Sequence, residues 1–279
     1  MTRPRLRVLR ILFRYAGACS PQLLARWGVY LWGKTHRPAW RQWEHKILAS
    51  ASRESLSTEH GQITVYRWGR GKKKILLLPG WNSRASHFRN FIKPLLESDY
   101  QVIGMDPPGH GYSSGNWTNI RQYLAAIEVV YENAGPFEAV IGHSFGGFCI
   151  PFALDRFPLA RKAILLATPV SLDWLFVRFC DIIDAAPSVR QKMKQRVERL
   201  LGNNCWQYYD VRKQAPKLSK IPVLVVHDDR DSGVPCEHAR EIQACWPGSK
   251  LLVTHKLGHQ RLLRHPDSIN PIIAFIHQD

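Results

Sequence analysis

The sequence predicts an α/β fold in which helices cover both faces of a mostly parallel β-sheet. Two observations support this: short apolar runs end in turn residues, and helical patterns alternate with these runs along most of the chain. Such alternation is typical of parallel sheets, because helical crossovers join their strands. The apolar runs lie at 63–68, 75–78, 102–105, 139–141, 163–167, 223–226 and 251–254, and the clearest helical patterns at 120–132, 145–155 and 236–244.

The length and composition of the chain indicate one large globular domain. Its 279 residues, 45% hydrophobic and 22% charged, can bury a core without the help of disulfides or metal. The six cysteines include no Cys-x-x-Cys pair, and the histidines around them do not have zinc-site spacing. We therefore predict no metal or cofactor, and a reducing, cytoplasmic setting.

Residues 1–62 are predicted to form a basic helical arm and lead-in, followed by an α/β body at 63–170 and 219–279. Within 1–53, eleven Lys and Arg residues stand against a single acid, Glu44, so this segment holds +10 of the net charge of +17. One interpretation is a solubilising arm that packs on the body. The other is peripheral contact with an anionic membrane, at its inner face.

The sequence carries no signature of nucleic-acid binding or of membrane insertion. No zinc-finger, helix-turn-helix or RNA-binding pattern accompanies the basic charge. Arg14 interrupts the apolar run 11–13, which argues against a signal peptide, and no stretch reaches about 18 uncharged apolar residues. We expect a small-molecule substrate and no nucleic-acid partner, and no pattern indicates an oligomeric state.

Residues 171–218 are predicted to form a helical cap inserted into the α/β body. Between the fifth and sixth apolar runs the alternation breaks, because this interval holds about two helical patterns and no strand pattern. An insertion at the carboxyl ends of the strands would lie over the crevice where open α/β sheets bind ligands. The apolar half of the cap carries Trp174, Phe176 and Phe179, which we predict to contact the substrate.

A Gly-x-Ser-x-Gly sequence at 142–146 directly follows an apolar run and opens a helical pattern. A strand-to-helix elbow strains and exposes the central serine, and the flanking glycines remove side chains that would clash. Ser144 is therefore the predicted nucleophile. The N–H of Phe145 would point at a developing oxyanion, and the N–H of Trp81, in the loop after 75–78, is the predicted second donor.

A serine nucleophile of this kind needs a histidine base. His259 follows the last strand pattern, at 251–254, and fits the chain order Ser…Asp…His, whereas His255 and His265 are competing candidates. His143 adjoins the serine, but neighbouring residues at a sharp elbow point apart, so we expect it to fill structure behind the sheet. We therefore predict His259 as the base.

The acid that orients the histidine should follow the strand pattern at 223–226. Three carboxylates are available there: Asp228, Asp229 and Asp231. The acid must reach the far ring nitrogen of the histidine and stabilise the imidazolium. Asp231 lies deepest in the loop and is the predicted acid, and we expect the other two to be loop hydrogen-bonders or partners of Arg230.

Across about residues 63–279 the sequence resembles the α/β-hydrolase superfamily. The likeness is carried by LLLPGW, MDPPGHGYSSG (105–115), GHSFGG, VHDDRDSGVP and LGHQRLLRHP. Pro79 stands where the oxyanion loop usually has histidine, and Asp228 where the acid loop usually has glycine. The arm and the TNI segment at 118–120 resemble a bacterial group of such hydrolases, a likeness that gives no substrate.

The resemblance implies the α/β-hydrolase fold and a catalytic triad of Ser144, Asp231 and His259. A serine nucleophile implies an acyl-enzyme and acyl transfer to water, which excludes the haloalkane dehalogenases and epoxide hydrolases, whose nucleophile is aspartate. We predict a carboxylesterase for small or medium acyl groups. Thioesterases, carbon–carbon bond hydrolases and perhydrolases use the same triad and stay open as alternatives, as does a degenerate hydrolase fold used for binding.

Overall fold

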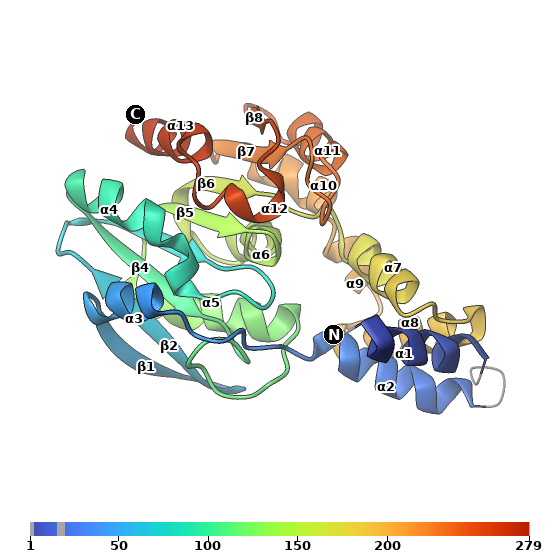
Figure 1. Ribbon diagram of the computed structural model, residues 1–279. Coiled ribbons are helices and arrows are strands. Elements are labelled where there is room, and N and C mark those ends of the chain that lie inside the picture. The colour runs from blue at the N-terminus through green and yellow to red at the C-terminus, as the bar shows by residue number, and fades with distance from the viewer. Residues whose placement is uncertain (1–2, 16–19, 279) are drawn as a thin grey trace. The chain divides into compact units, whose positions relative to one another are not determined.

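The computed structural model describes residues 3–15 and 20–278 (Figure 1). Cys19, one of the six cysteines, lies outside them. The chain divides into two compact units, Met1–Lys34 with Ser171–Asp210 and Thr35–Val170 with Val211–Asp279. We call the first the helical unit and the second the α/β unit.

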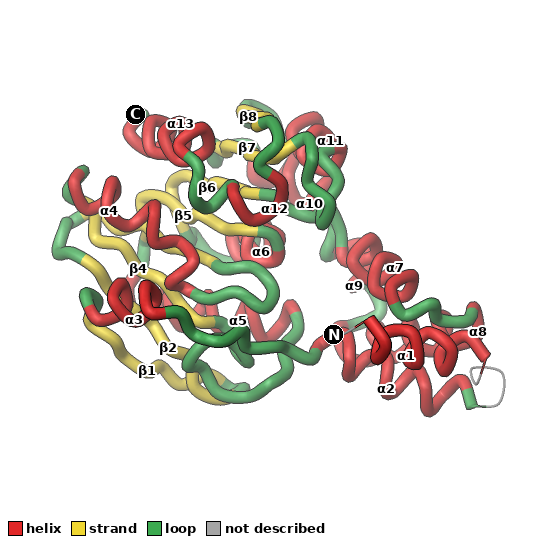
Figure 2. The backbone as a smooth tube through the Cα atoms, viewed as in Figure 1, coloured by secondary structure: helices red, strands yellow, loops and turns green. Residues whose placement is uncertain are grey.

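One eight-stranded sheet forms the centre of the α/β unit, with strand order β1-β2-β4-β3-β5-β6-β7-β8 (Figure 2). β2 pairs antiparallel with β1 and with β4, and all other neighbours pair in parallel. This confirms the predicted fold class. The strands are β1 (Ser52–Thr58), β2 (Gly61–Trp68), β3 (Lys73–Leu78), β4 (Tyr100–Asp106), β5 (Phe137–His143), β6 (Ala160–Leu166), β7 (Val223–Asp228) and β8 (Lys250–Thr254).

The sequence patterns do not predict the first strand, whose residues fall within the predicted arm and lead-in, 1–62. β1 reads Ser-Arg-Glu-Ser-Leu-Ser-Thr and contains one aliphatic side chain, Leu56, so it has no clear apolar alternation. Every one of its residues is exposed or partly exposed. Polar and charged side chains of this kind suit a sheet edge, because they discourage pairing with another chain.

Helices cover both faces of the sheet because successive strand residues point to opposite sides. Ile75, Leu77 and Ile141 share a buried cluster with apolar side chains of α4 and α13, and the α6 helix packs against β5 and β6. The helices of this unit are α3 (Gln42–Ala49), α4 (Arg89–Glu97), α5 (Ile120–Ala134), α6 (Phe145–Leu154), α10 (Val211–Gln214), α11 (Glu237–Cys245), α12 (Gly258–Arg261) and α13 (Pro266–His277), with short 3-10 turns η2 (Ala85–Phe88) and η3 (Ala215–Leu218).

The helical unit joins segments of the predicted arm and of the predicted cap. Its helices are α1 (Arg3–Tyr15), α2 (Pro21–Gly33), α7 (Leu172–Ile182), α8 (Pro187–Leu201) and α9 (Cys205–Tyr208). Phe13 of α1 is fully buried and stacks on Trp27, with ring centroids 5.4 Å apart. A Cβ on Gly28 of α2 would lie 2.6 Å from the sulfur of Met193 in α8, so the glycine permits this close approach.

The boundaries of the predicted arm and cap therefore change. Residues 35–62 and 211–218 belong to the α/β unit, and only 1–34 and 171–210 form the helical unit. The physical reason is that apolar side chains of both segments share one interior, as Trp32 and Phe176 do with ring centroids 5.6 Å apart. None of the described helices has the length and apolar character needed to cross a membrane.

Candidate active site

Ser144 lies at a sharp turn between β5 and α6. Its backbone angles, φ 53° and ψ −117°, fall in a region that side-chain-bearing residues rarely adopt. The Ser144 N–H donates to the carbonyl of Leu166, at the end of the neighbouring strand β6, over 2.8 Å. Because the elbow is held in this strained shape, the serine side chain stays partly exposed while its neighbours are buried.

Glycines let the chain pass closely on both sides of the elbow. A Cβ on Gly146 would lie 2.2 Å from the carbonyl oxygen of Leu78, where no side chain fits. A Cβ on Gly80 would lie 3.0 Å from the Cβ of Ser144. The loop after β3, which was predicted to donate to an oxyanion, is therefore adjacent to the serine.

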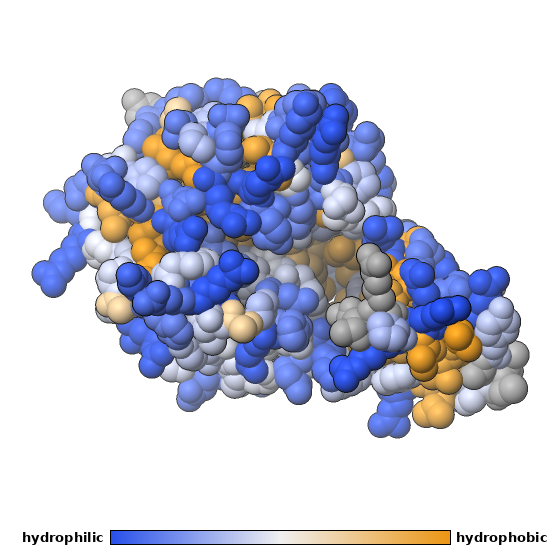
Figure 3. Space-filling view, in the orientation of Figure 1, coloured by the Kyte–Doolittle hydropathy of each residue, from blue (hydrophilic) through white to orange (hydrophobic). Residues whose placement is uncertain are grey.

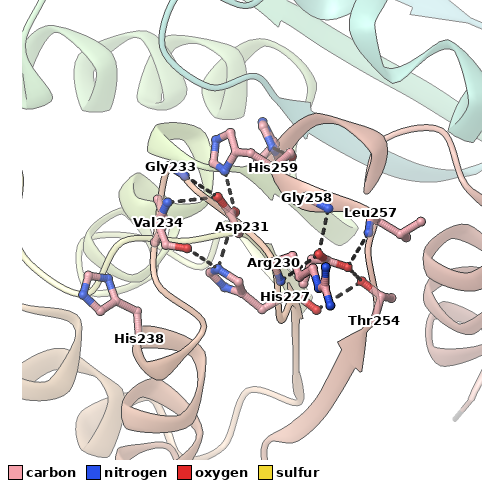
Figure 4. Close-up of polar contacts among 12 residues, drawn as sticks. His227, Arg230, Asp231, Gly233, Val234, His238, Thr254, Leu257, Gly258 and His259 are labelled. Carbon is pink, nitrogen blue, oxygen red and sulfur yellow. Dashed lines mark hydrogen bonds and ion pairs between the residues drawn. The ribbon is translucent and has the colours of Figure 1, made fainter.

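The predicted base and acid form a hydrogen bond with each other. His259 Nδ1 lies 2.7 Å from Asp231 Oδ2, the carboxylate is fully buried, and the imidazole is 21% exposed (Figure 4). The N–H groups of Gly233 and Val234 donate to the other oxygen, Oδ1, over 2.7 and 3.0 Å. Both oxygens of Asp231 thus have partners, and the imidazole ring is fixed by its Nδ1 edge.

The Asp231 carboxylate is held ionised. Burial by itself raises the pKa of Asp231, but the hydrogen bond and charge of His259 and the two backbone N–H groups lower it below its ordinary value. A carboxylate can only accept, so Nδ1 of His259 carries the proton that bridges the pair. The other ring nitrogen, Nε2, is then the basic one.

Asp228 has a different role from Asp231, although only two residues separate them. Its side chain is fully buried and accepts hydrogen bonds from the N–H groups of Leu257 and Gly258, over 2.8 and 2.7 Å. The Thr254 hydroxyl donates to it as well, over 2.8 Å. Asp228 therefore connects the end of β7 to the loop that follows β8 and carries His259, which we call the histidine loop. Both of its carboxylate oxygens accept hydrogen bonds from that segment.

The competing histidines have other partners. His255 pairs with Asp229 at an exposed position, and His265 accepts from the N–H of Asp267 at the start of α13, over 3.3 Å. Among the described residues, the histidines placed against Asp231 are His259 and His227. The geometry thus brings together one member of each predicted set, Asp231 and His259.

Two buried histidines that are not among the predicted site residues, His143 and His227, support the site. His143 Nε2 lies 2.9 Å from the carbonyl oxygen of His259, and burial lowers the pKa of His143 to about 3. It is therefore neutral and donates to the histidine loop. His227 Nε2 lies 2.9 Å from the carbonyl of Val234 and 3.5 Å from Asp231. The sequence signal for them was a histidine at or next to the carboxyl end of each of two mainly apolar strands, β5 and β7.

The two predicted oxyanion donors sit at the elbow and in the adjoining loop. Phe145 is the first residue of α6, and N–H groups at a helix start have no acceptor within the helix. The Trp81 ring meets the ring of Phe145 edge-on, with centroids 5.0 Å apart. The next N–H, that of Asn82, donates to Nε2 of His110 over 2.9 Å, which fixes the loop. No hydrogen bond among the described loop residues uses the N–H of Trp81.

The predicted substrate-contact residues lie on α7 in the helical unit. Phe176 is only 4% exposed, and its ring packs on those of Trp32 and Trp206 with centroids 5.6 and 5.2 Å apart. Phe179 stacks on Trp32 at 6.3 Å, and Trp174 is partly exposed. The first two thus serve the interior of their own unit, and their contact with substrate stays a prediction. Within the described residues, no group of His, Cys, Asp or Glu side chains is arranged to hold a metal ion.

Comparisons with known proteins agree with this fold. A family model described as alpha/beta hydrolase fold matches residues 73–204, and one described as TAP-like protein matches 197–277. A human serine hydrolase-like protein is 35% identical over 124 residues, which covers 42% of this chain and 61% of that protein. Human serine hydrolase-like protein 2 has the same identity, with 42% and 39% covered. The chain thus spans less than two thirds of these two relatives.

More distant relatives match over more of their length. A pimeloyl-(acyl-carrier protein) methyl ester esterase from Hamiltonella defensa is 20% identical, covering 76% of this chain and 96% of that protein. A solved Pyrococcus furiosus esterase shares the fold, with a TM-score of 0.67, 20% identity and 88% and 96% of the two chains covered. The matched regions together span 73–277, and the chain belongs to the α/β-hydrolase superfamily.

Proposed function

We propose that the protein is a serine hydrolase that cleaves carboxylic esters of small or medium acyl groups through an acyl-enzyme. The observation that carries the proposal is the His259–Asp231 hydrogen bond of 2.7 Å, which belongs to the same unit as a serine at a strained, partly exposed elbow. Each group matches a role that ester cleavage requires: nucleophile, base and orienting acid.

In the first half of the reaction, Nε2 of His259 takes the proton of the Ser144 hydroxyl as its oxygen attacks the ester carbonyl. The carbonyl oxygen becomes negative and accepts hydrogen bonds from the N–H groups of Trp81 and Phe145. Asp231 stabilises the imidazolium without taking its proton. When the tetrahedral species collapses, the ester C–O bond breaks, and the alcohol leaves with the proton from His259.

In the second half, water replaces the alcohol. His259 Nε2 takes a proton from the water as it attacks the acyl-serine carbonyl, and the same two N–H groups stabilise the oxyanion. Collapse breaks the bond to Ser144, which recovers its proton from His259, and the carboxylic acid is released. The balance is one ester and one water consumed, and one acid and one alcohol formed.

The similar proteins include several that are named as esterases, which supports esters as the substrate class. The Hamiltonella relative is a methyl ester esterase, and solved esterases from Pyrococcus furiosus and Exiguobacterium antarcticum share the fold. A thioesterase domain from the curacin biosynthetic pathway also shares it, with a TM-score of 0.60 and 18% identity. A thioester would meet the same nucleophile and oxyanion donors, so the leaving group has to be settled by experiment.

The test compares turnover of p-nitrophenyl esters of graded acyl length with that of acyl-CoA thioesters of the same lengths. We expect hydrolysis of the esters, with an optimum among short or medium chains, and weaker activity on the thioesters. The Ser144→Ala protein serves as the blank for activity that does not use the site. A clear preference for acyl-CoA would assign a thioesterase, and no activity on either series would contradict the proposal.

A further inference from the structure

The helix α1 exposes an apolar face that does not pack within its unit. Its inward face carries Leu9 and Phe13, which are 7% and 0% exposed. A second apolar row lies elsewhere on the helix, at the spacing i, i+3, i+4 and i+7, which places its members on one side. This row consists of Val8, Ile11, Leu12 and Tyr15, with exposed fractions of 67%, 54%, 38% and 67%.

The helix α2 continues this apolar surface. Leu23, Trp27 and Tyr30 recur at i, i+4 and i+7 and are 64%, 38% and 42% exposed. They line a groove together with Leu12 of α1 and Leu24, so the exposed rows of the two helices are continuous. We call these residues the α1–α2 apolar patch. Figure 3 shows an apolar area over α1 and α2 with hydrophilic residues beside it.

Basic side chains lie beside the patch, and Arg26 lines the groove itself. The first 34 residues of the sequence contain seven Lys or Arg and no Asp or Glu. Arg5, Arg7 and Arg26 are exposed, and Lys34 Nζ lies 5.6 Å from the centroid of the Tyr30 ring. The one carboxylate paired with an α1 arginine within the described residues belongs to Asp184, whose partner Arg14 is itself 60% exposed. The surface is therefore apolar at its centre and positive at its margin.

We propose that the α1–α2 apolar patch binds the surface of an anionic lipid bilayer. Aliphatic and aromatic side chains on one helical face bury into the boundary of headgroups and acyl chains, while Lys and Arg beside them contact the anionic headgroups. Leu23 and Ile11 would supply apolar insertion, and Trp27 and Tyr30 have the ring type that settles at the headgroup level.

Charge complementarity favours an anionic bilayer over a second copy of the chain or a nucleic acid as the partner of this patch. A second copy bound through the same patch would bring two strongly positive margins together, which opposes association. The phosphates of a nucleic acid could pair with the arginines, but they would not bury the exposed aliphatic side chains of Val8 and Ile11. An anionic bilayer satisfies both parts of the surface. The proposal does not depend on the proposed ester hydrolysis, because binding is measured without turnover.

The test is cosedimentation of the full-length protein with phosphatidylcholine vesicles that contain or lack phosphatidylglycerol. We expect binding to the phosphatidylglycerol vesicles at low salt, weaker binding at high salt and little binding to phosphatidylcholine alone. Arg5→Glu/Arg7→Glu should lower the partition coefficient about tenfold or more. Val8→Gln/Ile11→Gln should lower it by a similar factor, because both side chains are exposed and their replacement leaves the interior of the unit unchanged.

Matched controls carry the same changes elsewhere. Lys72→Glu/Lys73→Glu makes the same charge change at exposed positions of the α/β unit, and Val253→Gln replaces an apolar side chain that is 37% exposed on β8. Circular dichroism checks that all variants fold, and both controls should bind as the wild type does. Absence of binding to phosphatidylglycerol vesicles at low salt would overturn the proposal. Equal losses in the Lys72→Glu/Lys73→Glu control, or wild-type binding by Val8→Gln/Ile11→Gln, would overturn it too.

Discussion

The α/β unit and the helical unit hold their polar groups in opposite ways. At the candidate site, Asp231 is fully buried with both oxygens paired, and neutral His143 donates to the loop that carries His259. On the helical unit, the ion pair of Arg14 with Asp184 leaves the two side chains 60% and 41% exposed. Buried, fully paired groups keep the fixed geometry that bond cleavage requires. Exposed arginines keep the freedom to adapt to a soft, charged surface, and contribute little to stability.

Removal of the nucleophile should have the largest effect on the α/β unit and leave the surface of the helical unit unchanged. Ser144→Ala should lower ester turnover on the order of 10³-fold or more, because the members of a triad act as a unit. The fold should survive, since the backbone N–H that ties Ser144 to Leu166 is unaffected. Steady-state turnover and thermal unfolding measure the two effects. Near-wild-type turnover by this variant would refute the serine-hydrolase proposal.

The next prediction separates the three carboxylates of the acid loop. Asp231→Asn should lose at least about 10²-fold in turnover, because an amide cannot stabilise the imidazolium of His259. Asp228→Asn should chiefly lower the free energy of unfolding, by about 1–3 kcal/mol, since it weakens buried hydrogen bonds to the histidine loop. Asp229→Asn, at an exposed position, should change neither quantity much.

Turnover per folded molecule and urea unfolding distinguish these outcomes. If Asp228→Asn or Asp229→Asn loses far more turnover than Asp231→Asn while still folded, the assignment of the acid is wrong.

Because His143 is buried and neutral, its contribution to the free energy of unfolding should depend on pH. The pKa of His143 is about 3 when folded and 6.5 in a model peptide, so below pH 6.5 the unfolded chain takes up a proton that the folded protein does not. The contribution of this histidine is complete above pH 6.5 and is lost as the pH falls towards 3. Between pH 6.5 and 5 the loss is about 1–2 kcal/mol.

The variant His143→Gln keeps a side-chain N–H donor but cannot titrate. It should therefore be less stable than the wild type at pH 6.5, and this difference should shrink by about 1–2 kcal/mol at pH 5. Urea unfolding at the two pH values measures it, with the exposed His36→Gln as the matched control. A difference that stays constant with pH would show that His143 is not held neutral by burial.

The smallest effects are expected on acyl-chain preference. The sequence-based expectation is that Trp174, Phe176 and Phe179 contact the acyl chain, so replacing each by Ala should shift the chain-length optimum by a few-fold in relative kcat/KM. Phe176→Ala should also destabilise the protein by about 3–5 kcal/mol, because its ring is buried between Trp32 and Trp206. An unchanged preference in all three variants, with Val177→Ala on the same helix as control, would remove these residues from the substrate site.

The features that could be predicted from the sequence are those that have a local signal. The parallel strands and the places of Ser144, Asp231 and His259 follow from local signals, because each of these residues lies in the loop or turn that follows an apolar run. The polar edge strand at 52–58 gives no such signal. The association of 1–34 with 171–210 is also invisible to local patterns, because it depends on contacts between segments far apart in the chain, such as that of Gly28 with Met193.

The roles of the bracing groups could not be predicted for a related reason. Asp228 and Asp231 look alike in the sequence, and only the three-dimensional path of the histidine loop directs one to the N–H of Gly258 and the other to His259. His143 is similar: its position beside the serine suggested structural filling, and its hydrogen bond crosses to a residue 116 positions away.

The most direct test of the central claim is the labelling of the folded, full-length protein with a fluorophosphonate, followed by mass spectrometry of its peptides. The reagent reacts with a serine whose hydroxyl is activated by a base, and not with ordinary serines. We expect a single adduct, on Ser144, that is absent after unfolding and forms more slowly in Asp231→Asn. An adduct on a different residue, or a folded protein that takes up no label, would contradict it.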